Sequence, residues 1–137
     1  MDSIDLHTHV VPPNLIAAMQ RDPARFGATS AGANGIKVAE RNGKLCWETN
    51  GRLTEIERVL FDVDAKIAEM DRMRIDISAV SVAPPTYFYE LSPEAGLGAS
   101  RLSNDGIAQM VAKYPARLRG MATLPMQDPD AAITELE

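Results

Sequence analysis

The segment that most constrains this chain is an alternating apolar and polar stretch near its start, residues 4–13, which reads Ile-Asp-Leu-His-Thr-His-Val-Val-Pro-Pro. Alternation with a period of two is typical of a β-strand, predicted here over residues 4–9. Side chains two residues apart on a strand point the same way, so Asp5, His7 and His9 are expected on one face. A polar face on a strand of this kind needs a chemical reason.

His7 and His9 are the chain's two histidines. Two imidazoles separated by one residue on a strand face can bind a single metal ion at roughly 2.0–2.1 Å per nitrogen. The alternative is a pair of histidines hydrogen-bonded in a core. The strand ends at Pro12-Pro13, which leaves both imidazoles at its carboxyl end, where α/β folds place their chemistry, and this favours metal ligation. Asp5 is expected either to orient His7 as a hydrogen-bond acceptor or to lie deeper in the sheet.

Charge and cysteine content exclude several classes of protein. The net charge of −5 argues against nucleic acid or an anionic membrane as the partner. No apolar run approaches the roughly 18 residues of a membrane span, and the first strand begins too early for a signal peptide. The single cysteine, Cys46, excludes an internal disulfide, is expected to be a buried small apolar residue, and predicts a cytoplasmic protein.

After the first strand, the sequence predicts a short helix and an excursion. A helical stripe is expected over residues 14–25, followed by a small-residue loop over 27–35. Residues 36–49 alternate on both sides of Asn42-Gly43, the preferred central pair of a type I′ turn, and predict a β-hairpin. Residues 50–60 are expected to be a charged connector.

The rest of the chain alternates between helical and strand patterns. Buried strands are predicted over 77–83 and 118–124, each followed by proline, and the expected helices are 62–74, 92–114 and one that begins at Asp128. Alternating units specify a parallel sheet with right-handed crossovers. The three strands should therefore be neighbours in chain order, with Leu6, Val80 and Val82 facing the helices.

The order of these motifs resembles a known family. Residues 4–9, the hairpin, Ile-Ala-Glu-Met-Asp at 67–71, Pro84-Pro85 with an aromatic cluster, and Thr-Leu-Pro-Met-Gln-Asp-Pro at 123–129 are similar to the aminocarboxymuconate-semialdehyde decarboxylase-like branch of the amidohydrolase superfamily. The resemblance implies a (β/α)8 TIM barrel of the metal-dependent hydrolase type. Such a barrel takes roughly 250 residues, so residues 1–137 are expected to be the N-terminal part of one barrel domain. They would supply its first three βα units, with a hairpin insertion at about 14–61.

The resemblance also implies an activity, with alternatives. The expected function is metal-dependent decarboxylation of an unsaturated or aromatic carboxylic acid. Hydrolysis of an ester, lactone or amide is the first alternative, and a truncated, inactive metal-binding fragment is the second. His7 and His9 match the family's first-strand ligands for one divalent metal, usually zinc. Its further ligands, a histidine and an aspartate, and its acid/base histidine have no counterpart, so no catalytic residue is expected within this chain.

Substrate-binding residues follow from the same resemblance. Arg52 lies near the position where family members hold the substrate carboxylate, with Arg58 as its competitor and a solvated surface role as the alternative. Trp47, Tyr87 and Phe88 are expected to form the wall of a site for a small unsaturated acid, unless they only pack. A homo-oligomer is left open.

Overall fold

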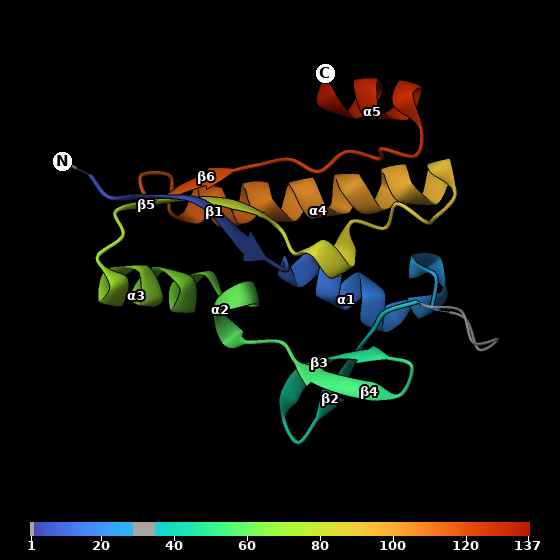
Figure 1. Cartoon of the computed structure of the whole chain (residues 1–137), viewed down its shortest axis with the longest axis horizontal. Coiled ribbons are helices and arrows are strands. Elements are labelled where there is room, and N and C mark those ends of the chain that lie inside the picture. Colours follow the sequence, from blue (N-terminus) through green and yellow to red (C-terminus); the bar gives the residue numbers. More distant parts are fainter. Residues whose placement is uncertain (1, 29–34) are drawn as a thin grey trace.

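A parallel sheet carries the predicted histidine strand. The computed structural model describes residues 2–28 and 35–137, so most of the expected loop 27–35 lies outside the described residues. Strands β1 (Ile4–Val10), β5 (Ile77–Val82) and β6 (Leu118–Gly120) pair in parallel in the order β1-β5-β6 (Figure 1). The prediction of three neighbouring parallel strands in chain order is confirmed.

The third strand is shorter than predicted. Pairing of β6 with β5 ends at Gly120, although the backbone N–H of Met121 still donates to the carbonyl of Val80 at 2.8 Å. Beyond this point no neighbouring strand among the described residues pairs with the chain. The Asn104 side chain instead makes hydrogen bonds to the backbone N–H and carbonyl of Thr123. A side chain has therefore replaced the sheet ladder over the second half of the expected strand.

Strand β1 contains a bulge that the alternating sequence did not predict. Between two registered pairs, β1 advances three residues, from Asp5 to Thr8, while β5 advances two, from Ser78 to Val80. An extra residue in one strand reverses which face the following side chains take. Asp5 Oδ1 accepts the backbone N–H of His7 at 3.2 Å, which stabilises the chain within the bulge.

The bulge corrects two predicted side-chain directions. Asp5 and Thr8 both lie opposite buried residues of β5, so Asp5 does not share the face of His9, which lies opposite Ser81. Leu6 was expected to face the helices, but it is 77% exposed and lines a pocket with His7. The predicted inward direction holds for Val80 and Val82, which are fully buried.

The predicted hairpin is part of a second, antiparallel sheet. Strands β2 (Lys37–Arg41) and β3 (Lys44–Thr49) are joined by Asn42 and Gly43, both with positive φ, as a type I′ turn requires. A third strand, β4 (Arg52–Glu55), pairs with β3. The predicted connector over 50–60 is therefore wrong, because it contains β4 and the short helix α2 (Arg58–Phe61).

The helices begin where the sequence places their caps. Asp62 caps α3 (Val63–Met73), Ser92 caps α4 (Pro93–Lys113) and Asp128 caps α5 (Pro129–Leu136). The first predicted helix is divided at Asp22-Pro23 into α1 (Pro13–Arg21) and the 3-10 turn η1 (Pro23–Phe26). A second 3-10 turn, η2 (Pro84–Thr86), follows β5.

The core joins the two sheets through the helices. Figure 1 shows α4 running along the parallel sheet and α1 between that sheet and the antiparallel one. The largest fully buried side chains come from β1, α1, η1, α3, β5 and β6, and include Val10, Leu15, Met19, Phe26, Met70, Val80, Val82 and Leu118. Among residues 2–28 and 35–137, no helix has the length and apolar character of a membrane span.

Candidate active site

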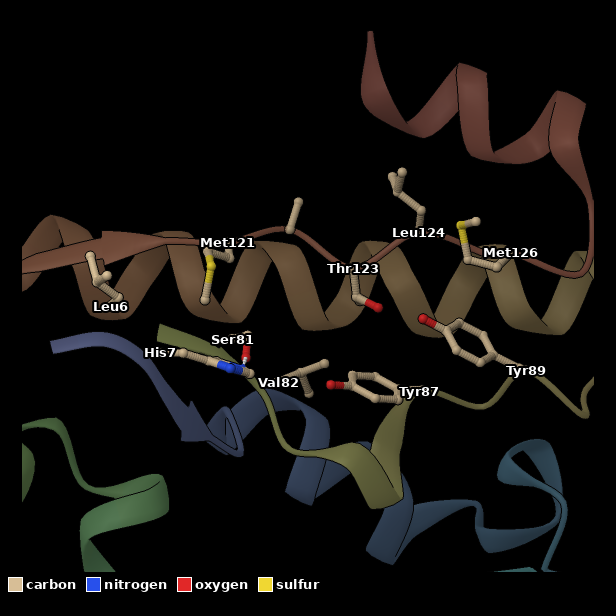
Figure 2. Close-up of a pocket in the computed structure, with 11 residues that line it drawn as sticks. Leu6, His7, Ser81, Val82, Tyr87, Tyr89, Met121, Thr123, Leu124 and Met126 are labelled. Carbon is tan, nitrogen blue, oxygen red and sulfur yellow. Dashed lines mark hydrogen bonds between the residues drawn. The ribbon is translucent and has the colours of Figure 1, made fainter. Parts of the chain in front are cut away.

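A pocket of about 460 Å³ opens on the face of the parallel sheet that carries the histidines. Leu6 and His7 of β1 line one side, Ser81 and Val82 of β5 form the floor, and the segment after β6 supplies most of the other side (Figure 2). Tyrosines from the turn after β5 complete the wall. The pocket therefore collects side chains from three consecutive βα units.

His7 lines this pocket, and His9 lies next to His7 without lining the pocket itself. Their ring centroids are 4.8 Å apart and the rings are nearly perpendicular, at 83°. His7 Nε2 is 3.0 Å from the hydroxyl oxygen of Ser81. His9 Nε2 is buried and has no hydrogen-bond partner among the described residues. An unpartnered, buried imidazole nitrogen is unusual, because an unsatisfied polar atom in a protein interior costs about 1–3 kcal/mol.

The surroundings of His9 favour its neutral form. Burial lowers the pKa of His9 from its usual value, and positive charge on His7 and on Lys66 lowers it further. Only a neutral imidazole has a nitrogen lone pair to donate to a metal ion. The unpartnered nitrogen and the lowered pKa together fit metal ligation better than a hydrogen-bonded core histidine.

A buried lysine lies behind the same strand. Lys66 of α3 is 8% exposed, and its ammonium donates to Thr8 Oγ1 at 2.7 Å and to the His9 carbonyl at 3.4 Å. Burial lowers the pKa of Lys66, while Asp5 and Glu69 oppose this shift. These contacts connect the backbone at His9 to α3.

The donor set suits a divalent metal but is incomplete. A catalytic zinc ion takes about three protein ligands and keeps one position open. Within the described part of the chain, no cluster of three or more histidine, cysteine, aspartate or glutamate side chains is arranged to hold a metal. His7 and His9 can therefore supply two ligands, and any complete site needs further ligands from residues outside this arrangement.

The aromatic cluster after β5 divides between the pocket and the core. Tyr87, as expected, lines the pocket. Phe88 was expected there as well, but it is 2% exposed and packs against Phe26, with ring centroids 5.2 Å apart. The second aromatic wall residue is Tyr89, which stacks on Tyr87 with centroids 5.4 Å apart and planes 17° apart. The positive φ of Phe88, 54°, turns its side chain away from those of its two neighbours.

The predicted residues of the hairpin region lie in the antiparallel sheet. Trp47 is half-buried on β3 and packs against the core. Arg52 is exposed on β4, and neither residue lines the pocket. Arg58, the competitor of Arg52, is paired with Asp62 at 2.6 Å. The structure thus brings His7 and Tyr87 together and leaves Trp47 and Arg52 on another surface.

Two pocket residues escaped the sequence analysis. Ser81 is a polar residue in the mostly apolar strand β5 and lines the pocket, and this polar residue was the available signal. Thr123 was assigned to a strand, whereas it lies beyond the end of β6, where its side chain lines the pocket. Nothing in the local pattern indicated its direction.

No protein-family model matches the chain, but individual relatives do. The chain is 31% identical to 2-amino-3-carboxymuconate-6-semialdehyde decarboxylase of Dictyostelium discoideum, over 97% of this chain and 35% of that protein. It is 37% identical to gamma-resorcylate decarboxylase of Rhodococcus jostii, over 60% of this chain and 25% of that protein. The chain spans about a third of the length of the first relative.

Solved structures agree with the sequence matches. The apo form of Metarhizium anisopliae IDCase matches with a TM-score of 0.74 at 20% identity, covering 98% of this chain and 38% of that one, which supports the fold. A dihydroxybenzoic acid decarboxylase from Polaromonas sp. JS666, solved with bound manganese and the inhibitor 2-nitroresorcinol, matches with a TM-score of 0.59. It is 25% identical, over all of this chain and 34% of that one. The resemblance inferred from the order of the motifs is confirmed.

Proposed function

Because the chain belongs to the aminocarboxymuconate-semialdehyde and gamma-resorcylate decarboxylase branch of the amidohydrolase superfamily, we propose that the complete protein is a metal-dependent decarboxylase. Its substrate is an unsaturated or aromatic carboxylic acid. This chain supplies the first three βα units of a (β/α)8 barrel, with β1, β5 and β6 as three consecutive barrel strands. The single cysteine supports a cytoplasmic setting.

The observation that carries this proposal is the unpartnered, buried Nε2 of His9, whose ring contacts that of the pocket residue His7. These two imidazoles hold one divalent ion together with ligands from the remainder of the barrel. Zinc was the expected ion, and the manganese bound by a relative makes manganese an equal candidate. When bound, such an ion supplies Lewis-acid stabilisation of the negative charge that develops as carbon dioxide leaves.

The residues of this chain bind and orient rather than transfer protons. Ser81 fixes the ring of His7 through its hydroxyl. Tyr87 and Tyr89 present a stacked aromatic wall to the unsaturated body of the substrate. Arg52 is the candidate for the substrate carboxylate if β4 reaches the mouth of the complete barrel. The acid/base group comes from the remainder of the protein, because both histidines are committed to the metal.

The test is carbon dioxide release by the complete protein. Metal-free protein should be inactive on benzoate-type and unsaturated acids, and zinc or manganese should restore release. His7→Ala and His9→Ala should abolish release in the presence of metal, while Lys44→Ala, a change on the exposed β3 surface, should leave it unchanged. If the protein instead hydrolysed an ester, lactone or amide in a metal-dependent way and released no carbon dioxide, it would be a hydrolase and not a decarboxylase. If metal removal reduced neither carbon dioxide release nor hydrolysis, the proposed metal site would be refuted.

A further inference from the structure

Thr123 places an unpartnered polar atom at the pocket. The residue is 7% exposed and lines the pocket, and its hydroxyl oxygen makes no hydrogen bond to any of the residues the structure describes. A buried hydroxyl normally finds a partner, since removing it from water without one is unfavourable. The hydroxyl turns about a single bond and can both donate and accept, so a ligand in the pocket can supply the partner that the protein does not.

The backbone of Thr123 is held by a dedicated side chain. Asn104 of α4 accepts the backbone N–H of Thr123 at 2.8 Å through Oδ1 and donates to its carbonyl at 3.0 Å through Nδ2. The same amide also donates to Glu135 of α5 at 2.8 Å. These bonds replace the strand ladder that ends at Gly120. Thr123 is thus held in place before a ligand arrives, as a recognition group must be.

The neighbours of Thr123 are aromatic and uncharged. Figure 2 shows Thr123 on the same segment as Met121 and Met126, with its hydroxyl on the side that faces Tyr87 and Tyr89. The residues that line this part of the pocket carry no formal charge. Such surroundings suit the conjugated body of an acid, whereas a second carboxylate would be left without a counter-charge.

We propose that Thr123 is a specificity-determining residue, whose hydroxyl binds an uncharged oxygen substituent, a hydroxyl or carbonyl group, on the conjugated body of the substrate acid. This inference rests on the proposed function, in which the carboxylate end of the same molecule lies at the histidine pair. A site built to hydrogen-bond a substituent discriminates against the analogue that lacks it.

The experiment compares the binding of four acids to two proteins. Binding of benzoate and of the three monohydroxybenzoates to the metal-loaded complete protein is measured by calorimetry, for wild type and Thr123→Val. Valine keeps the shape of threonine and removes the hydroxyl. At least one hydroxybenzoate should bind the wild type about fivefold to tenfold more tightly than benzoate, and Thr123→Val should remove this advantage while leaving benzoate binding unchanged.

A stability measurement tests the unpartnered state separately. Thr86 is the matched control, because its buried hydroxyl donates to the carbonyl of Ala83 at 2.7 Å. Thr86→Val should lower the Tm of the free protein, whereas Thr123→Val should leave it unchanged or raise it. A drop in Tm for Thr123→Val equal to that for Thr86→Val would overturn the inference, since the Thr123 hydroxyl would then have a partner within the protein.

The two levels of the proposal fail in different ways. If the wild type binds none of the four acids, the proposed function fails and the inference with it. If the acids bind and Thr123→Val weakens benzoate and the hydroxybenzoates equally, or changes neither, the inference alone is overturned.

Discussion

His7 and His9, two residues apart, have different surroundings, and the difference defines the site. His7 is exposed to the pocket and bonded to Ser81, whereas the Nε2 of His9 is buried without a partner among the described residues. Lys66 adds a positive charge behind His9, which disfavours protonation of the imidazole. One candidate ligand is thus positioned by a hydroxyl, and in the other burial and nearby charge favour the neutral imidazole.

The pKa of His9 is a direct test of this arrangement. In the metal-free protein, NMR titration of the imidazole should give His9 a pKa below its usual value near 6.5. The unfolded chain then binds the proton more readily than the folded chain. His9 therefore lowers the free energy of unfolding as the pH falls below about 6.5, and this decrease stops once the pH is below the pKa of His9 in the folded protein. Lys66→Met should raise the pKa of His9 by removing a positive charge. A His9 pKa above 6.5, or no response to Lys66→Met, would contradict this description of the site.

Arg52 can be tested against Arg58 in the complete enzyme. If Arg52 binds a substrate carboxylate, Arg52→Ala should raise the Michaelis constant about tenfold or more with metal content unchanged. Arg58→Ala should have little effect on the Michaelis constant, because Arg58 is paired with Asp62. Steady-state kinetics with metal analysis decides between them, and equal losses from both variants would remove Arg52 from the site.

Among the strands, local turn chemistry could be predicted from the sequence and the register of β1 could not. Asn42-Gly43 correctly predicted the β2–β3 turn. Asn50-Gly51 is the same pair of residues and forms the β3–β4 turn, where Asn50 has a φ of 50° and Gly51 a φ of 76°. The charged residues around Asn50-Gly51 nevertheless suggested a connector. The β1 bulge depends on pairing with a strand about 70 residues away, so alternation alone cannot reveal it. For the same reason the sequence misplaced Asp5 and Leu6, whereas metal binding by His7 and His9 stays a prediction.

The second Asn-Gly turn makes a prediction about stability. Gly51 has a φ of 76° and open space where an added methyl group would lie, so Gly51→Ala should cost about 1 kcal/mol of unfolding free energy through backbone strain alone. Gly43→Ala, with a φ of 74° and equally open space, is the matched control and should cost the same. Urea denaturation measures both. A negligible cost for Gly51→Ala would show that β4 is not held by this turn.

The chain as a whole leaves apolar surface uncovered. Large apolar side chains are exposed on β1, after β6 and on α5, including Ile4, Leu6, Met126, Ile133 and Leu136. The parallel sheet formed by the described residues also ends in two strands with one free edge each, β1 and β6. Exposed strand edges and apolar patches favour association with other protein surface. In the proposed barrel, this surface would be covered by the strands and helices that follow.

The isolated 137-residue chain should therefore show no turnover. Two imidazoles hold a metal weakly, and the chain has no third histidine for acid/base work. We expect no carbon dioxide release with zinc or manganese present, and concentration-dependent association in sedimentation experiments. Turnover by the chain alone that disappears in His7→Ala and His9→Ala would show that two protein ligands suffice and that the proposed division of the site is wrong.

The measurement closest to the central claim is anomalous X-ray diffraction from crystals of the complete protein grown with manganese or zinc, which locates the ion directly. We expect one anomalous peak in the pocket, with a nitrogen of His7 and a nitrogen of His9 both about 2.0–2.2 Å from it. The His9 nitrogen should be Nε2, the atom that lacks a partner among the described residues of the free chain. A peak elsewhere, or an ion bound with either imidazole turned away, would contradict the proposed metal site.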